Sequence, residues 1–352
     1  MRLGLNLRYL GNLGAGADPR TSARYVQEAE RLDYAVAWTA EAFSSDAVSL
    51  LGYLAAQTSR IELGTAAMQI PARSPAMTAM TATTLDILSE GRFRLGLGVS
   101  GPQVAEGWHG ARFDRPLART CEYLDIVRMA LRREDVVYDG AHYRLPLPDG
   151  PGKPLRLGTR PRRKDVPVYL AAVGPRNVEL AGEIADGWLS VFFQPETVAE
   201  HLPLLRAGRA RTGRDLTGFD IVSSMPAVVG DDVADCADRV RVYTAHYLGG
   251  MGSRKENFYN RLAARMGYPE AAQRVQELYL DGRPREAAAA IPQQFLERTC
   301  LLGPVERIAD TLREHAEAGV TTLSAMIFPT DAEDGLRTLR ALADALKRAG
   351  VG

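Results

Sequence analysis

The chain has 352 residues, of which 46% are hydrophobic and 24% charged, and 43 basic residues balance 43 acidic ones. This composition is that of a globular protein, and a net charge of zero provides no attraction to nucleic acid or to a membrane surface. Its apolar runs are too short for a membrane span or a signal peptide, so we expect a cytoplasmic protein. The three cysteines, Cys121, Cys236 and Cys300, lie far apart and are expected to be reduced, structural thiols.

Apolar, strand-like segments alternate with segments of helical spacing along the first part of the chain. We expect Thr21 or Ser22 to cap the first helix, and Ser74-Pro75 is a typical helix start. The predicted strands are 3–7, 35–38, 61–68 and 93–99, and the predicted helices are 21–32, 46–58, 74–88 and 116–131. Strands separated by helices form parallel βαβ units, so we expect a parallel sheet.

Residues 134–167 interrupt this alternation. The stretch is rich in proline and in basic residues, and Asp139-Gly140 between β-prone residues is typical of a hairpin turn. We interpret it as a surface excursion and not as a domain linker, because strands and helices resume directly after it. The later strands are predicted at 168–172, 186–192, 219–228 and 321–327, and the later helices at 174–185, 195–211, 235–248, 303–318 and 334–348.

Eight strand–helix units in one chain predict a single (β/α)8 (TIM) barrel over residues 1–352. The excursion follows the fourth helix of this barrel. A helical insertion, residues 253–296, follows the seventh strand, and we expect it to form a lid over the barrel mouth. Its candidate substrate contacts are Tyr259, Arg261, Arg265 and Tyr268.

Residues 91–110 combine a β-strand that has a bare face with a polar loop. Gly96 and Gly98 alternate with large apolar residues, which allows another backbone or a flat ligand to come close to one face. Gly96, Gly98 and Gly101 also match the dinucleotide-binding pattern G-x-G-x-x-G, but that motif requires a helix beginning at its third glycine. We expect no helix before about Arg115, so we reject this interpretation.

The C-terminal ends of the predicted strands carry few acids or bases. Two carboxylates suitably spaced for a glycosidase are lacking, and the five histidines are too scattered to predict a metal site. Small side chains at a barrel mouth favour a flat ring cofactor that brings its own reactivity. The strand-end residues are Asn6, Glu41, Thr65, Ala66, Ser100, Gly101, Gln103, Ala171 and Ala172.

The turn Gly174-Pro175-Arg176 is the best candidate for binding a phosphate. It presents backbone N–H groups at a helix start, with a guanidinium beside them. The alternative is a plain strand–helix turn with a solvated arginine.

Several motifs spread along the chain carry a family resemblance. They are Trp38-Thr-Ala-Glu41, Leu63-Gly-Thr-Ala-Ala67, Ser74-Pro-Ala-Met-Thr-Ala79, Gly91-Arg-Phe-Arg-Leu-Gly-Leu-Gly-Val-Ser-Gly101, Ala171-Ala-Val-Gly-Pro-Arg176 and Ala185-Asp-Gly-Trp188. With these motifs the chain resembles the luciferase-like family of flavin- and deazaflavin-dependent oxidoreductases. Gly98-Val-Ser-Gly-Pro-Gln103, followed by Glu106-Gly-Trp-His-Gly110, is similar to members that use coenzyme F420, a deazaflavin, in place of FMN.

The resemblance implies roles for individual positions. A non-proline cis peptide would lie at Thr65-Ala66 and back the central ring of the cofactor. The loop from Ser100 to Gln103 would contact the ring and the ribityl chain, and the turn from Ala172 to Arg176 would bind the cofactor phosphate. Glu41 would be an acid near the reacting face. Relatives are commonly dimers, so the resemblance also implies a homodimer.

The chain departs from the sugar-phosphate dehydrogenases of this family at two positions. Ala42 stands where they have a histidine, and Gly101-Pro-Gln103 stands where they have a glutamate, so we do not expect glucose-6-phosphate as the substrate. His109 in the same loop is a second candidate proton donor, although a structural histidine that holds the loop explains it equally well.

These features predict an oxidoreductase that transfers a hydride between F420 and a small organic substrate with a C=C, C=N or alcohol/carbonyl group. Glu41 or His109 would handle the proton. Two alternatives stay open: an FMN-dependent monooxygenase on the same barrel, and a barrel that binds the cofactor without turnover.

Overall fold

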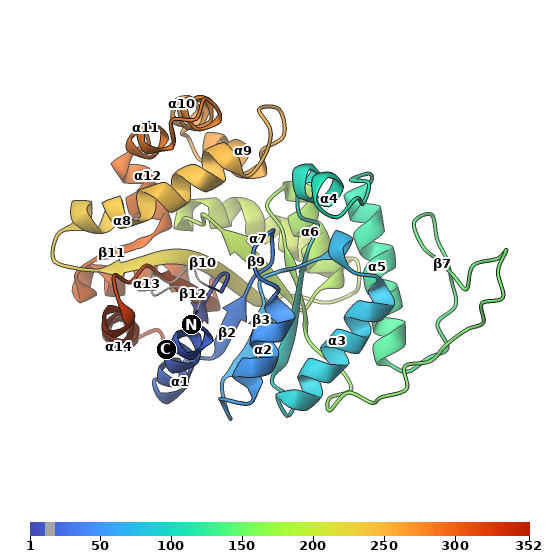
Figure 1. The fold of residues 1–352 in the computed structure, drawn as a ribbon. Helices are drawn as coiled ribbons and strands as arrows, with labels where there is room; N and C mark the ends of the chain where they lie inside the picture. The colour runs from blue at the N-terminus through green and yellow to red at the C-terminus, as the bar shows by residue number, and fades with distance from the viewer. Residues whose placement is uncertain (11–17) are drawn as a thin grey trace.

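Eight parallel strands form a closed barrel in the computed structural model, which describes residues 1–10 and 18–352 (Figure 1). Pairing of the last barrel strand with the first, and of the sixth with the seventh, completes the ring. The barrel strands are β1 (Arg2–Asn6), β2 (Val36–Thr39), β3 (Glu62–Thr65), β5 (Phe93–Gly98), β8 (Val168–Ala171), β9 (Gly187–Val191), β10 (Asp220–Val229) and β12 (Thr322–Ile327). The predicted TIM barrel is confirmed.

Four of the eight helices that surround the barrel begin at a side chain that caps them, namely Asp18, Asp46, Ser74 and Asp331. Ser74 accepts a hydrogen bond from Met77 N, as predicted, but the first helix begins earlier than expected, with Asp18 as its cap in place of Thr21 or Ser22. Pro19 at the first helical position explains the earlier start. These helices are α1 (Pro19–Arg31), α2 (Ala47–Ala55), α3 (Pro75–Leu88), α5 (Pro116–Leu131), α6 (Pro175–Ile184), α7 (Pro195–Ala210), α13 (Val305–Glu317) and α14 (Ala332–Ala349).

The non-proline cis peptide bond after β3 lies one residue later than the family resemblance implied. The cis peptide bond lies at Ala66–Ala67 and not at Thr65–Ala66. The strand hydrogen bonding continues through Ala66, whose N–H donates to Thr39 O at 2.6 Å, so the chain turns only afterwards. A short strand, β4 (Met68–Gln69), and a 3₁₀ turn, η1 (Ile70–Ala72), then lead to α3.

A short helix, α4 (Pro102–Gly107), begins directly after Gly101, so the expectation of no helix before residue 115 was wrong. Its six residues are too few to show a hydrophobic period, and Pro102 occupies the first helical position, where proline is well tolerated. The position of β5 as the fourth strand of a closed barrel excludes the dinucleotide-binding fold instead.

The excursion contains the predicted hairpin, β6 (Tyr138–Asp139) and β7 (Arg144–Leu145), which extends away from the barrel in Figure 1. The connection is residues 140–143, so Asp139 belongs to the strand and not to the turn. Glu122 of α5 accepts hydrogen bonds from the backbone N–H groups of Ala141, His142 and Tyr143, which ties the connection to the barrel.

The insertion lies over one side of the barrel mouth (Figure 1) and has its own hydrophobic core. Val240 and Phe295 are among its fully buried members, and Cys236 and Cys300 are buried there as free thiols. Its helices are α9 (Phe258–Arg265), α10 (Pro269–Leu280), α11 (Pro284–Ala289) and α12 (Gln293–Thr299). They pack against α8 (Val233–Ala245) and a π-helical turn, η2 (His246–Gly250), which precede the insertion and share its core. An unpredicted strand, β11 (Leu301–Gly303), then pairs with the C-terminal end of β10.

Within residues 1–10 and 18–352, no helix combines the length and the apolar character that crossing a bilayer requires.

Candidate active site

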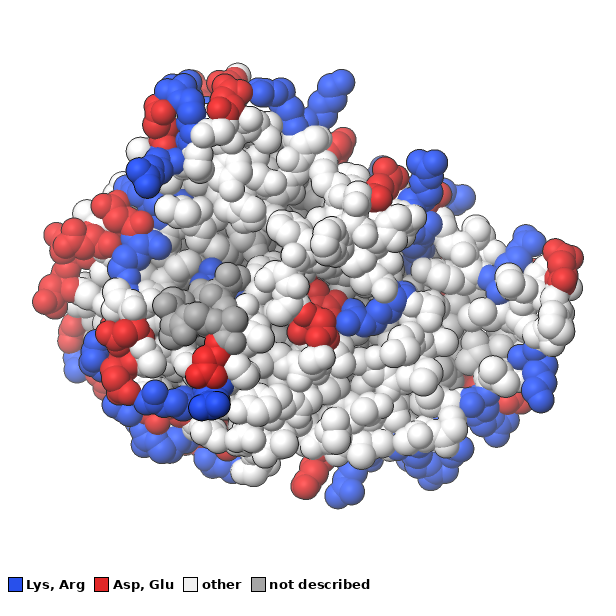
Figure 2. All heavy atoms as spheres, viewed as in Figure 1, with Lys and Arg blue, Asp and Glu red and all other residues white. Residues whose placement is uncertain are grey.

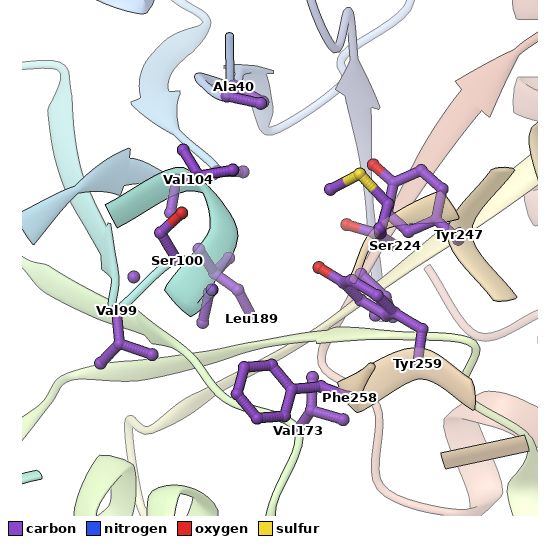
Figure 3. Close-up of a pocket in the computed structure, with 18 of the residues that line it drawn as sticks. Ala40, Val99, Ser100, Val104, Val173, Leu189, Ser224, Tyr247, Phe258 and Tyr259 are labelled. Carbon is purple, nitrogen blue, oxygen red and sulfur yellow. The ribbon is translucent and has the colours of Figure 1, made fainter. Parts of the chain in front are cut away.

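A cavity of about 420 Å³ opens where the C-terminal ends of the barrel strands meet the insertion (Figure 3). Every one of the eight barrel strands, or the turn that follows it, contributes a residue to its lining. This is the end of the barrel at which TIM-barrel enzymes carry their active sites.

The two walls of the cavity differ in side-chain size. Ala66, Ala67, Gly98 and Ala171 make one part of the strand-side wall small, whereas α8, η2 and the insertion supply large rings opposite. A Cβ placed on Gly98 would lie 3.5 Å from the Cβ atoms of Ala67 and Ala171, so a larger side chain there would fill space beside this wall. The rings opposite are Tyr243, Tyr247, Phe258 and Tyr259.

The two glycines of β5, Gly96 and Gly98, serve different purposes. A Cβ on Gly96 would lie 1.8 Å from Thr65 O, so Gly96 permits the close approach of β3 to β5. Thr65 is fully buried beneath the cavity and exchanges hydrogen bonds with the backbone of Gly96. Thr65 therefore does not line the cavity, whereas Gly98 does.

Glu41 lines the cavity, but its carboxylate is already engaged. Arg73 donates to both oxygens at 2.6 and 2.7 Å, and Ala47 N donates to one of them at 3.2 Å. Burial lowers the pKa of the Arg73 guanidinium, but the hydrogen bonds and charge of Glu41 outweigh burial and raise the pKa overall. Arg73 lies in the loop before α3, outside any motif, and sequence reasoning missed it.

His109 does not line the cavity but supports a residue that does. Its Nε2 lies 3.1 Å from Gln69 Oε1, and Gln69 Nε2 donates to Ala42 O at 2.7 Å. Gln69 is thus fixed at both ends of its amide and borders the cavity. This arrangement matches the alternative in which the histidine is structural.

The candidate phosphate turn borders the cavity through its first half. Gly174 caps α6 without a side-chain hydrogen bond, which leaves the N-terminal amides of this helix open to a ligand. Pro175 and Arg176 are exposed and lie outside the cavity lining. A different guanidinium reaches this turn: Arg265 Nη2 of α9 donates to Val173 O at 3.4 Å.

The structure thus divides the predicted site residues into two groups. Thr65, His109, Pro175 and Arg176 do not line the cavity. The residues that do are Asn6, Glu41, Ala66, Ser100, Gly101, Gln103, Ala171, Ala172 and Gly174.

The four candidate substrate contacts of the insertion also fall into two groups. Tyr259, Arg261 and Arg265 line the cavity, whereas the ring of Tyr268 packs against Phe295 at a centroid distance of 5.2 Å inside the insertion.

An aromatic cluster around Arg8 was not predicted. The guanidinium carbon of Arg8 lies 4.3 Å from the ring centre of Phe328 and 5.4 Å from that of Tyr243, and burial lowers the pKa of Arg8. The hydroxyl group of Tyr247 hydrogen-bonds to those of Tyr9 and Tyr243, and burial raises the pKa of each of the three. The i, i+4 spacing of Tyr243 and Tyr247 was a sequence signal for a shared face.

Curated relatives cover most of the chain. A protein of Mycobacterium tuberculosis, provisionally named a coenzyme F420-dependent oxidoreductase, is 41% identical over 97% of this chain and 99% of its own length. The 5,10-methylenetetrahydromethanopterin reductase of Archaeoglobus fulgidus is 26% identical over 86% of this chain and 87% of its own.

Solved structures share the fold. The F420-dependent tetrahydromethanopterin reductase of Methanopyrus kandleri superimposes with a TM-score of 0.82 at 22% identity, covering 98% of this chain and 97% of that one. An F420-dependent secondary alcohol dehydrogenase, solved with an F420–acetone adduct, gives 0.79 at 18% identity, with 98% of both chains covered.

The model of the luciferase-like monooxygenase family matches residues 1–322. With this match over most of its length, and with a barrel whose strand ends form one cavity, the chain belongs to the luciferase-like family.

Proposed function

We propose that the protein is a coenzyme F420-dependent oxidoreductase that transfers a hydride between F420 and a small organic substrate. The observation that carries this proposal is the cavity with one wall of small residues and one of rings. A flat tricyclic ring fits against the first wall, and a substrate fits between the ring and the second. The 41% identical relative named for F420 favours this cofactor over FMN.

The residues present fit the cofactor. Ala66, Ala67 and Gly98 form a wall without protruding side chains, against which a planar ring can lie. The loop from Ser100 to Gln103 borders the same space. The uncapped N-terminus of α6, with Arg265 beside it, offers amides and a positive charge to the phosphate.

When bound, F420 supplies the chemistry, because it carries two electrons as a hydride. The chain binds and orients both partners and limits access of water through its lid. Glu41 is held by Arg73 and presents a fixed carboxylate at the cavity edge. We assign it a positioning role, because its oxygens already accept hydrogen bonds from Arg73 and from the backbone.

We also propose a cytoplasmic homodimer that forms through α2 and α3. The exposed side chains on these helices include Tyr53, Met77, Met80 and Leu88. Helix α2 has no charged residue, and the one charge on α3, Asp86, is buried and paired with an arginine of the excursion. Figure 2 shows few charged side chains over these helices. An exposed apolar surface of this kind is typical of a protein–protein contact.

Titration with F420 and with FMN, followed by fluorescence quenching, tests the cofactor. We expect saturable binding of F420 and weaker binding of FMN. Tighter binding of FMN would instead support the monooxygenase alternative, for which the fold neighbour that binds FMN, a Baeyer-Villiger monooxygenase of Pseudomonas putida, is the precedent. Tight binding of F420 without hydride exchange on a panel of ketones, enones, imines and alcohols would support the non-catalytic barrel.

A further inference from the structure

Tyr259 points its hydroxyl group from the lid toward the middle of the cavity (Figure 3). Among the residues that the structure describes, this hydroxyl has no hydrogen-bond partner, in contrast to the linked hydroxyl groups of Tyr9, Tyr243 and Tyr247. A polar group that faces a cavity without a protein partner is suited to bind a polar atom of a ligand.

The position of Tyr259 is fixed by its surroundings. Its ring meets that of Tyr247 edge to face at a centroid distance of 4.9 Å. Its backbone N–H donates to Asn257 Oδ1 at 3.0 Å, and the buried Asn257 side chain also donates to Tyr247 O and Leu248 O. Asn257 therefore caps α9 and joins it to η2, so that Tyr259 and Tyr247 are positioned together.

The charged groups around the ring-lined part of the cavity are already engaged, and they include Arg8, whose guanidinium lies over the rings of Phe328 and Tyr243. Glu41 is paired with Arg73, and Arg261 with Glu256 at 3.0 Å. Arg265 lies at the turn that we assign to the cofactor phosphate. A charged substrate would lose its hydration and would have to displace one of these contacts to gain a counter-charge, so a neutral substrate is favoured.

We propose that this part of the cavity binds a neutral, planar ring compound that carries a ketone, with the ketone oxygen accepting a hydrogen bond from Tyr259. The inference rests on the proposed function and specifies its substrate class. Phe258 and Tyr247 offer ring faces and edges to the flat part of such a compound.

Reduction of such a ketone needs a donor for the charge that develops on oxygen. Reduced F420, when bound, would supply the hydride for the new C–H bond. The electron pair of the C=O bond would move to the oxygen, which would finally take a proton from water. Burial raises the pKa of Tyr259, so its hydroxyl stays protonated and donates throughout the neutral range. A donor aimed at developing charge stabilises the transition state more than the bound ketone.

The test compares Tyr259→Phe with wild-type protein and with Tyr268→Phe, a matched control whose ring packs inside the insertion. The probes are acetophenone and α-methylstyrene, which have similar shapes but differ in C=O and C=CH2. Their dissociation constants are measured by calorimetry on protein loaded with oxidised F420. We expect wild type and Tyr268→Phe to prefer acetophenone by about 3- to 10-fold, the contribution of one hydrogen bond, and Tyr259→Phe to lose this preference.

Turnover provides a second measurement. With reduced F420, kcat for acetophenone reduction should fall about 100-fold in Tyr259→Phe, as expected for loss of one oxyanion donor. An unchanged preference for acetophenone in Tyr259→Phe, or no preference in wild type, would overturn the inference while F420 binding and hence the proposed function stand. Failure of the wild-type protein to bind F420 would overturn both.

Discussion

The carboxylate of Glu41 and the guanidinium of Arg73 form a bidentate ion pair, with N–O distances of 2.6 and 2.7 Å. Only 7% of the Glu41 side chain and 18% of the Arg73 side chain are exposed. The pair joins the loop after β2, which borders the cavity, to Arg73, which directly precedes Ser74, the cap of α3. We infer that it sets the shape of this edge of the site.

Glu41→Gln should therefore act first on stability. The change leaves a mostly buried guanidinium without its main counter-charge, and the free energy of unfolding should fall by about 2–4 kcal/mol. Urea unfolding measures this loss. In a double-mutant cycle with Arg73→Met, the double variant should lose less than the sum of the two single losses. If Glu41→Gln kept full stability and F420 affinity but lost turnover, Glu41 would be a proton donor and not a positioning residue.

Gly98→Leu should block cofactor binding, because the new side chain would occupy the space beside the wall of Ala67 and Ala171. We expect F420 affinity to fall about 10- to 100-fold. Gly107→Leu is the matched control, since a Cβ there meets no atom within 4 Å and the position lies outside the cavity lining. Equal affinity in Gly98→Leu and wild type would place the ring elsewhere.

Met80→Glu should convert a dimer into a monomer, because it introduces a charge into the apolar surface of α2 and α3. Met80 is 53% exposed, so the change should leave the fold intact. Light scattering coupled to size-exclusion chromatography measures the mass, and Val242→Glu, an exposed apolar position on α8, is the control. A wild-type protein that elutes as a monomer at all concentrations would refute the proposed dimer.

Glu28 should make stability depend on pH at the acid end. Hydrogen bonds from Arg31 are the main cause that lowers the pKa of its carboxyl to about 2, and Arg340 of α14 adds to the effect. Because this pKa is below the unfolded value of about 4.3, the stabilisation is present above pH 4.3 and is lost as the pH falls towards 2.

The two arginines are more than half exposed, so solvent screens the pair, and we expect a contribution of about 1–2 kcal/mol. Glu28→Gln should unfold more easily than wild type at pH 7 and equally easily near pH 2, as measured by urea titration at both pH values. A difference that does not change with pH would show that packing, and not charge, is responsible.

The fold could be predicted from the sequence because the local signals for strands and helices agree with the eightfold alternation that a (β/α)8 barrel requires. Pro116 marks the start of α5, and its helical period runs to Leu131, as predicted. Prediction fails where an element is too short to show a periodic pattern, as in α4 with six residues and β11 with three. The start of α1 was missed because Asp18 competes with Thr21 and Ser22 as a cap, and only the observed hydrogen bond to Arg20 N decides between them.

The strand-side half of the site was predictable for the same reason, since residues at strand ends meet at one mouth. Ser100 and Ala171 were found in this way. The opposite half depends on tertiary structure. Arg73 reaches Glu41 across 32 positions of the sequence, and Tyr259 enters the cavity only because Asn257 ties α9 to η2. No local pattern reports such contacts.

The most direct measurement is a crystal structure of the protein with F420 bound. We predict that the deazaflavin ring lies against Ala66, Ala67 and Gly98, that the phosphate lies at the N-terminus of α6 near Arg265, and that the opposite ring face looks towards Tyr259. A ring bound outside the strand-end cavity, or a phosphate far from Gly174, would contradict the account.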